Sequence, residues 1–91
     1  MILTIVAPGG VLCEVTTDRV SFPGTVGRFT VLKDHAPLIA GLGGGEIVYA
    51  TTEGDARLRI KNGCVRVLGN RIEACVEPSD AASGKGEETA K

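Results

Sequence analysis

Residues 57–76 read RLRIKNGCVRVLGNRIEACV, and the alternation of apolar and polar side chains in this stretch decides the fold class. Its first part has the cleanest period-two pattern of the chain, with Leu58 and Ile60 on one face and cationic side chains on the other. Asn62-Gly63 is the strongest short hairpin dipeptide, and Gly69-Asn70 offers a second turn. The stretch therefore predicts three short antiparallel strands joined by two tight turns.

The same succession of strands and turns continues outward from this stretch. Further strands are expected at residues 2–6, 11–17, 18–22, 29–32 and 46–50. Turns are predicted at Pro8-Gly9-Gly10 and at Thr52–Asp55, with Gly54-Asp55 at its tip, and a flexible connection is predicted at 41–45. Short strands at roughly 8–12-residue spacing are typical of a sandwich or barrel. We expect one all-β domain over residues 1–76, a flattened β-sandwich of short, mostly antiparallel strands.

Composition narrows the functional classes. A formal net charge of −1 and 3% aromatic residues, with no Trp, provide neither a basic footprint nor stacking platforms for nucleic acid. The odd set Cys13, Cys64 and Cys75 favours free thiols in a reducing compartment over a disulfide scaffold. All three lie in strand patterns, where cysteine behaves as a small buried hydrophobe.

The N-terminal segment is apolar, but it lacks a basic region and is interrupted by Pro8, so we expect no signal peptide. No run approaches the roughly 20 apolar residues of a membrane span. We expect a soluble chain that is not inserted in a membrane and that meets one only through partners.

A second informative stretch, residues 22–42, combines a turn signal, a short strand and a loop that contains proline. Pro23 fixes φ, and Gly24 accepts the positive φ that a type II turn needs. After the strand 29–32, Lys33-Asp34 is predicted to turn the chain into the loop His35-Ala36-Pro37-Leu38, where Pro37 excludes a regular ladder. A polar loop, a histidine and an apolar segment, 36–39, lie close together here. This combination predicts a contact surface rather than a catalytic set.

Pro23-Gly24-Thr25-x-Gly27-x-Phe29, followed by His35-Ala36-Pro37-Leu38, resembles the epsilon subunit of F-type ATP synthases. The His-Ala-Pro-Leu tetrad at this distance is the most specific part of the match. Asn62–Val67 resembles a later Ser-Gly-Gly motif of that family, and Leu3–Pro8 resembles its opening strand. The resemblance covers residues 1–76 and corresponds to the family's N-terminal β-sandwich domain.

The resemblance implies a non-catalytic rotor subunit in the central stalk of a proton-translocating ATP synthase. Such a subunit does no bond chemistry and needs no cofactor, because it couples rotation of the c-ring to the gamma subunit. It would lie at the cytoplasmic face of a bacterial inner membrane, peripheral to it through the complex. The residues implied in contact with the c-ring are Thr25, Val26, Gly27 and Arg28, and those implied in contact with gamma are His35, Ala36, Pro37 and Leu38.

Several of these assignments stay open at the level of sequence. The family usually carries acidic residues at the positions of Val26 and Arg28, so a carboxylate contact cannot be carried over to this chain. Arg28 is expected either to face an acidic or carbonyl-rich patch of the c-ring or to be a solvated loop residue. His35 is expected either to hydrogen-bond to backbone at the base of its loop or to lie at the gamma surface. Leu38 fits the gamma face and the core equally well.

Residues 77–91 form a segment of different composition, with no apolar side chain larger than Ala apart from Pro78. Such a segment cannot bury a face, so we predict a flexible, disordered tail. Most members of the family continue instead into a C-terminal helical hairpin, which inhibits ATP hydrolysis in many bacterial forms. The hypothesis is a short form without inhibitory helices, and the alternative is that the chain is the N-terminal part of a longer protein.

Other functional classes find less support. A stand-alone β-barrel module that binds a small ligand or a peptide would explain the strands and glycine turns but not the His-Ala-Pro-Leu tetrad. The segment 41–46 looks like a dinucleotide loop, yet Glu46 stands where Gly or Ala belongs and no strand–loop–helix unit surrounds it. Metal-ligand spacing is absent, and a Cys/His hydrolase would need a group that orients His35. We expect neither an enzyme nor a cofactor.

Overall fold

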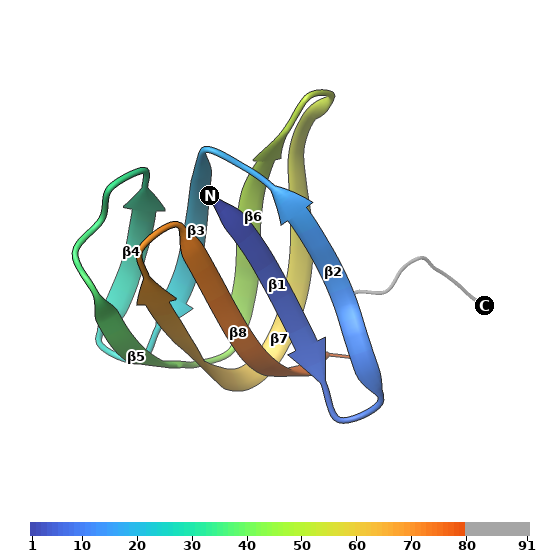
Figure 1. Ribbon diagram of the computed structural model, residues 1–91. Helices are drawn as coiled ribbons and strands as arrows, with labels where there is room; N and C mark the ends of the chain where they lie inside the picture. Colours follow the sequence, from blue (N-terminus) through green and yellow to red (C-terminus); the bar gives the residue numbers. More distant parts are fainter. Residues whose placement is uncertain (80–91) are drawn as a thin grey trace.

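Every regular element of residues 1–79, the part of the chain that the computed structural model describes, is a β-strand (Figure 1). The strands are β1 (Ile2–Ala7), β2 (Gly10–Thr16), β3 (Arg19–Gly24), β4 (Gly27–Leu32), β5 (Leu38–Leu42), β6 (Gly45–Thr51), β7 (Gly54–Leu68) and β8 (Arg71–Pro78). The predicted all-β class is confirmed. Tight turns at Pro8-Gly9 and Gly69-Asn70 lie where the sequence indicated them.

The strands pair into one continuous sheet that folds over on itself into two layers. Its order is β2-β1-β8-β7-β5-β3-β4, and β6 pairs with β3 and β7. The pairing of β1 with β8 is parallel and the others are antiparallel. The long strand β7 belongs to both layers, because its first half pairs with β6 and its second half pairs with β5 and β8. In Figure 1, β1, β2 and β8 lie in front of β3 and β6, as expected for a flattened sandwich.

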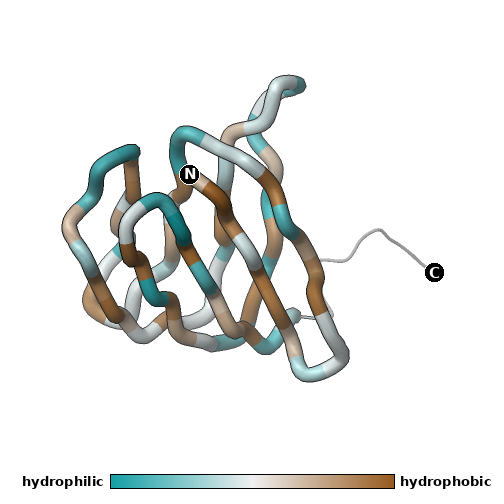
Figure 2. Tube along the Cα trace, in the orientation of Figure 1, coloured by the Kyte–Doolittle hydropathy of each residue, from teal (hydrophilic) through white to brown (hydrophobic). Residues whose placement is uncertain are grey.

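The core lies between the layers and is filled from alternate strand positions, because successive side chains of a strand point to opposite faces. Phe22 on β3 is fully buried, and its ring centroid lies 5.6 Å from that of Phe29 on β4. Figure 2 shows the alternation of hydropathy along β8. The buried core comprises Leu3, Ile5, Val20, Phe22, Val31, Leu42, Ile47, Ile60, Val65, Val67, Ile72, Ala74 and Val76.

The predicted hairpin at Asn62-Gly63 is wrong, because β7 runs straight through this dipeptide. The register against β8 steps from Ile60↔Pro78 to Asn62↔Glu77, so Lys61 is the extra residue of a β-bulge. The glycine serves close approach instead of a turn: a Cβ at Gly63 would collide with the Cys75 carbonyl oxygen and come within 3.0 Å of Val76. The local turn preference is overridden by pairing on both sides of β7.

The predicted turn at Pro23-Gly24 is also displaced. Both residues belong to β3, where Gly24 pairs with Gly27, and the turn itself is Thr25-Val26. Gly27, not Gly24, takes the positive φ, at 134°. Gly24 is required for space, since an added Cβ would lie 2.5 Å from the Gly27 carbonyl oxygen and 2.9 Å from the Phe29 ring.

Two further boundaries differ from the prediction. The tip of the β6–β7 hairpin is Thr52-Glu53 rather than Gly54-Asp55, because the Thr51 hydroxyl accepts from the Glu53 N–H at 3.1 Å and donates to the Gly54 carbonyl. The predicted connection 41–45 is mostly strand, with only Gly43-Gly44 between β5 and β6.

The predicted strand 71–76 continues to Pro78, which pairs with Ile60. The first residues of the predicted tail therefore belong to β8. Residues 80–91, with the predicted disorder of the tail and the predicted lack of inhibitory helices, lie outside the described residues. The described residues include no helix long and apolar enough to cross a membrane.

Candidate functional site

The β3–β4 turn carries the residues implied in contact with a c-ring. Thr25 and Val26 form its tip, and the Val26 side chain is completely exposed, at 102% of its reference area. The tip is held from below by β5, because the Thr25 N–H donates to the Gly41 carbonyl at 3.1 Å and the Gly43 N–H donates to the Pro23 carbonyl at 2.8 Å. An apolar side chain thus projects from a turn whose base is fixed by backbone hydrogen bonds.

Arg28 follows this turn and is tied to its own chain. Its guanidinium donates to the Glu46 backbone carbonyl at 2.7 Å. The Glu46 carboxylate in turn accepts from Arg57 at 3.2 Å and lies 4.0 Å from Arg59. Two guanidinium groups therefore face the Glu46 carboxylate, and a third, that of Arg28, binds the backbone carbonyl of the same residue. The three guanidinium groups carry more positive charge than this carboxylate balances, which suits an acidic or carbonyl-rich neighbour. Arg28 uses one of its hydrogen-bond donors within its own chain.

The loop between β4 and β5 carries the other set, those implied in contact with gamma. Asp34 takes a left-handed φ of 64°, and the His35 N–H donates to the Leu32 carbonyl at 3.2 Å, which confirms the turn at Lys33-Asp34. The His35 imidazole Nδ1 lies 2.7 Å from the Ala36 carbonyl oxygen. Because a carbonyl only accepts, this contact requires the tautomer with the proton on Nδ1. His35 thus makes the backbone hydrogen bond of its first interpretation.

The apolar segment 36–39 divides between the inside and the outside of the sandwich. Leu38 is half-buried and packs against the core, whereas the next residue, Ile39, is 78% exposed. This follows from strand geometry, since β5 begins at Leu38 and its neighbour must face the other way. Ala36 and Pro37 are exposed in the loop. The outward apolar surface of this segment therefore consists of Pro37 and Ile39 rather than Leu38.

The two sets of residues start at opposite ends of β4, but β5 brings the second set back toward the first, since the Gly41 carbonyl that binds the Thr25 N–H is only two residues from Ile39. The six residues of β4 separate the β3–β4 turn from the β4–β5 loop, as the cyan and green segments of Figure 1 show. A strand of this length spans roughly 20 Å. The sequence-predicted residues therefore form two neighbouring surfaces, the tip of the β3–β4 turn and the β4–β5 loop with the start of β5, instead of one site.

Among residues 1–79, no arrangement of side chains is suited to catalysis or to metal binding. No group of three His, Cys, Asp or Glu side chains there is placed to hold a metal ion. The His35 imidazole hydrogen-bonds to the Ala36 backbone carbonyl rather than to a nucleophilic side chain. The expectation of buried cysteines is wrong for two of the three: Cys64 and Cys75 are exposed on the outer face, and only Cys13 is half-buried.

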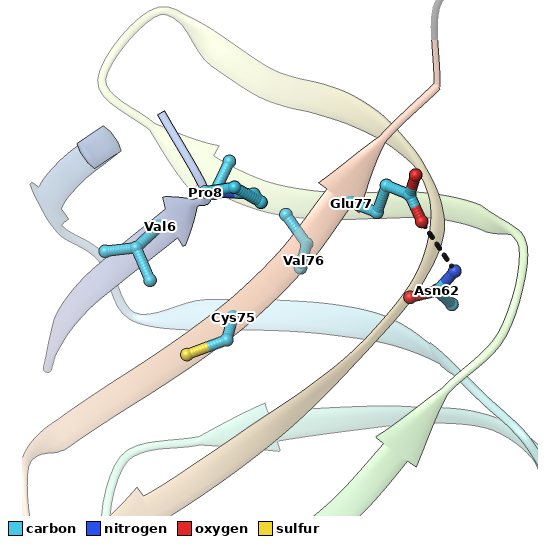
Figure 3. Close-up of a pocket in the computed structure, with 7 residues that line it drawn as sticks. Val6, Pro8, Asn62, Cys75, Val76 and Glu77 are labelled. Atoms are coloured by element: carbon cyan, nitrogen blue, oxygen red, sulfur yellow. Dashed lines mark hydrogen bonds between the residues drawn. The ribbon is translucent and has the colours of Figure 1, made fainter. Parts of the chain in front are cut away.

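A surface hollow of about 630 Å³ lies between the end of β1 and the end of β8. Figure 3 shows Val6 and Pro8 on one side and Cys75 and Val76 on the other. At its far side, Asn62 donates to the Glu77 carboxylate at 3.1 Å. Sequence reasoning missed this hollow, because it depends on the parallel pairing of β1 with β8, the first and last strands of the described residues.

Comparisons with protein families and with individual known proteins match the chain to the same kind of protein. A family model described as ATP synthase, Delta/Epsilon chain, beta-sandwich domain matches residues 1–79. The ATP synthase epsilon chain of Endomicrobium trichonymphae is 34% identical over 73 residues, covering 80% of this chain and 53% of its own. That of a Sulfurovum species is 35% identical, covering 100% of this chain and 72% of its own. The chain thus spans between about half and three quarters of the length of these relatives.

Solved structures with the same fold come from two mitochondrial ATP synthases. A chain of the Tetrahymena thermophila central stalk and c-ring structure has a TM-score of 0.71 at 14% identity, covering 85% of this chain and 63% of its own. A chain of the Euglena gracilis structure, which contains OSCP, F1 and the c-ring, has a TM-score of 0.77 at 16% identity, covering 84% and 49%. At these identities the likeness concerns the fold alone.

Proposed function

The chain belongs to the delta/epsilon-chain β-sandwich family of ATP synthase, and from this premise we propose that it is a non-catalytic subunit of the central stalk of a rotary ATP synthase. In this role it couples rotation of the c-ring to the gamma subunit. The observation that carries the proposal is the family match over residues 1–79, the entire described part of the chain. The complex would hold it at the cytoplasmic face of a bacterial membrane.

The proposed contacts use two surfaces, the tip of the β3–β4 turn and the β4–β5 loop with the outward side of β5. Val26 and Arg28 at the β3–β4 turn face the polar loops of the c-ring, and Pro37 and Ile39 with the His35 loop face gamma. Two features support this assignment. The turn projects an exposed apolar side chain from a base fixed by hydrogen bonds, and the guanidinium groups around Glu46 carry excess positive charge beside it.

A crossed binding experiment tests the proposal. The full chain, Val26→Asp and Ile39→Asp are each measured against the gamma subunit and against the c-ring of the same organism. Both side chains are exposed, so neither change should disturb the fold. We expect Ile39→Asp to weaken gamma binding about tenfold or more and to spare the c-ring, and Val26→Asp to do the reverse. Each variant is the control for the other.

The two parts of the proposal fail in different ways. If the unmodified chain binds neither partner, the stalk role is withdrawn. If it binds both and the variants do not separate them, the stalk role stands and the assignment of the two surfaces to different partners is wrong. An Arg28→Glu variant that binds the c-ring more tightly would contradict the acidic or carbonyl-rich partner surface assigned to Arg28.

A further inference from the structure

Cys64 and Cys75 lie directly opposite each other on the antiparallel strands β7 and β8. Neither belongs to a disulfide in this structure, and both are exposed on the outer face of the sheet. Exposed cysteines are unusual, because this residue is among the most often buried. Packing gives no reason for a thiol at either position. Two cysteines paired across neighbouring strands on an exposed face therefore suggest a chemical role for their thiols.

The spacing of the strands suits a bond between them. Directly opposed residues of an antiparallel pair have Cα atoms about 4.5 to 5.5 Å apart, and disulfides span Cα distances of about 4.4 to 6.8 Å. Their side chains leave the sheet on the same face. The Cβ atoms of such pairs are about 4.5 to 5.5 Å apart, whereas a disulfide needs about 3.5 to 4.5 Å. The strands must therefore close by about 1 Å, a strain that keeps the bond reducible but is smaller than the gain from having the two thiols held side by side.

The neighbours of the pair leave it open to reagents. On β5 the residue opposite Cys64 is Gly41, which has no side chain to cover the sulfur. On β1 the residue beside Cys75 is Val6, and both line the open hollow of Figure 3. No charged residue is the direct strand neighbour of either cysteine across the sheet.

We propose that Cys64 and Cys75 form a reversible dithiol–disulfide pair, a redox modification site on the outer face of the sandwich. The oxidant is a low-molecular-weight disulfide of the glutathione class. One protein thiolate attacks this disulfide, so that a mixed disulfide forms and one small thiolate leaves. The second protein thiolate then attacks the mixed disulfide at the protein sulfur and releases the other small thiolate. The protein loses two electrons and two protons, and the small disulfide becomes two thiols.

The test is an equilibration of the full 91-residue chain in buffers of graded oxidised-to-reduced glutathione ratio, read by intact mass and by peptide mapping. We expect an internal Cys64–Cys75 disulfide that dithiothreitol reverses. Its formation should need an oxidised-to-reduced ratio about tenfold or more lower in the folded chain than in the same chain in denaturant, because the fold holds the two thiols together. Circular dichroism checks that each sample is folded.

Serine variants identify the partners. Cys13→Ser is the matched control and should behave like the unmodified chain. Cys64→Ser and Cys75→Ser should each retain the fold, form no internal bond and accumulate a mixed glutathione adduct on the remaining exposed cysteine. Uptake of glutathione at both cysteines of the unmodified chain without an internal bond would overturn the proposal. A disulfide that maps to Cys13, or that forms no more readily in the folded chain than in denaturant, would overturn it as well.

Discussion

Single residues in this chain are often fixed by space rather than by their own conformational preference. Gly24 and Gly63 look like turn residues, but each stands where a Cβ would strike the backbone of the next strand. Gly9 is different, since a Cβ built on it meets no atom within 4 Å and its φ is not in the left-handed region. The two kinds of glycine therefore respond oppositely to the same substitution.

Gly24→Ala should destabilise the fold by about 1–3 kcal/mol, because the new methyl group would lie 2.5 Å from the Gly27 carbonyl oxygen and force the β3–β4 pair apart. The free energy of unfolding in urea measures this loss. Gly9→Ala is the matched control and should change stability by less than about 0.5 kcal/mol. Equal effects of the two substitutions would show that the close approach at Gly24 is relieved at no cost.

The stability of the fold is expected to depend on pH through one side chain, Tyr49. Burial, followed by the interaction with the Cys13 sulfur 3.4 Å from its hydroxyl, raises the pKa of Tyr49 from 10.0 to about 12. The folded chain therefore keeps the phenol proton between pH 10 and 12, whereas the unfolded chain loses it. The unfolded state then binds fewer protons, so this group's stabilisation is present below pH 10 and falls as the pH rises toward 12.

We accordingly expect the stability difference between the unmodified chain and Tyr49→Phe to shrink above pH 10. Urea unfolding of both proteins at a series of pH values measures it, and the subtraction cancels the titration of lysines. Cys13→Ser is a second comparison, because it keeps a hydrogen-bonding side chain beside the phenol while changing its strength. A difference that stays constant from pH 9 to 12 would contradict the raised pKa.

At the scale of elements, some connections between strands are held by a single residue that makes several hydrogen bonds. Thr17, between β2 and β3, is a buried polar residue at 4% exposure. Its hydroxyl donates to the Ala50 carbonyl of β6 at 2.7 Å, and its N–H donates to the Met1 carbonyl at 2.9 Å. One residue thus joins the start of β1 and the end of β6 at the same corner.

Thr17→Val keeps the shape of this side chain and removes its hydroxyl, so the Ala50 carbonyl loses its contact with that donor. We expect a loss of about 1–3 kcal/mol in the free energy of unfolding. Thr17→Ser keeps the hydroxyl and should cost about 1 kcal/mol or less, for one buried methyl group. The order of the two variants in thermal or urea unfolding is the measurement. A serine variant less stable than the valine variant would mean that packing, not hydrogen bonding, fixes this corner.

The elements also show what sequence could and could not predict. Period-two patterns located most strands, because they depend only on which face is buried, as for Val20 and Phe22. The hairpin expected at Asn62-Gly63 failed because pairing of β7 with β5 and β8 outweighs a dipeptide preference. That β7 serves both layers is a long-range fact, invisible in a local pattern.

The contact surfaces were predicted in the same uneven way. The motif residues 25–28 and 35–38 do lie in or beside loops, but only the start of β5 decides that Ile39 points outward and Leu38 inward. The register Cys64↔Cys75 follows from the turn at Gly69-Asn70 by counting back along both strands. The pairing of the two cysteines could therefore be predicted from the sequence, but it was overlooked because the thiols were expected to be buried.

At the scale of the whole molecule, the pairing of β1 with β8 brings distant parts of the chain together. For such non-local pairing, long loops must close and lose entropy before the stabilising contacts form. We therefore expect refolding on a timescale of about milliseconds to seconds. Stopped-flow dilution from urea, followed by the fluorescence of Tyr49, the one tyrosine of the chain, measures it. Relaxation within microseconds would contradict the dominance of these long-range pairings.

The strand β7 has a mechanical consequence. Two sheets held together only by side chains are free to slide past each other when a sideways load is applied. Here such sliding would have to break backbone hydrogen bonds, because one covalent strand is paired with β6 in one layer and with β5 and β8 in the other. A twist delivered to one layer would therefore turn the other layer through nearly the same angle, with little of the work stored as deformation in between.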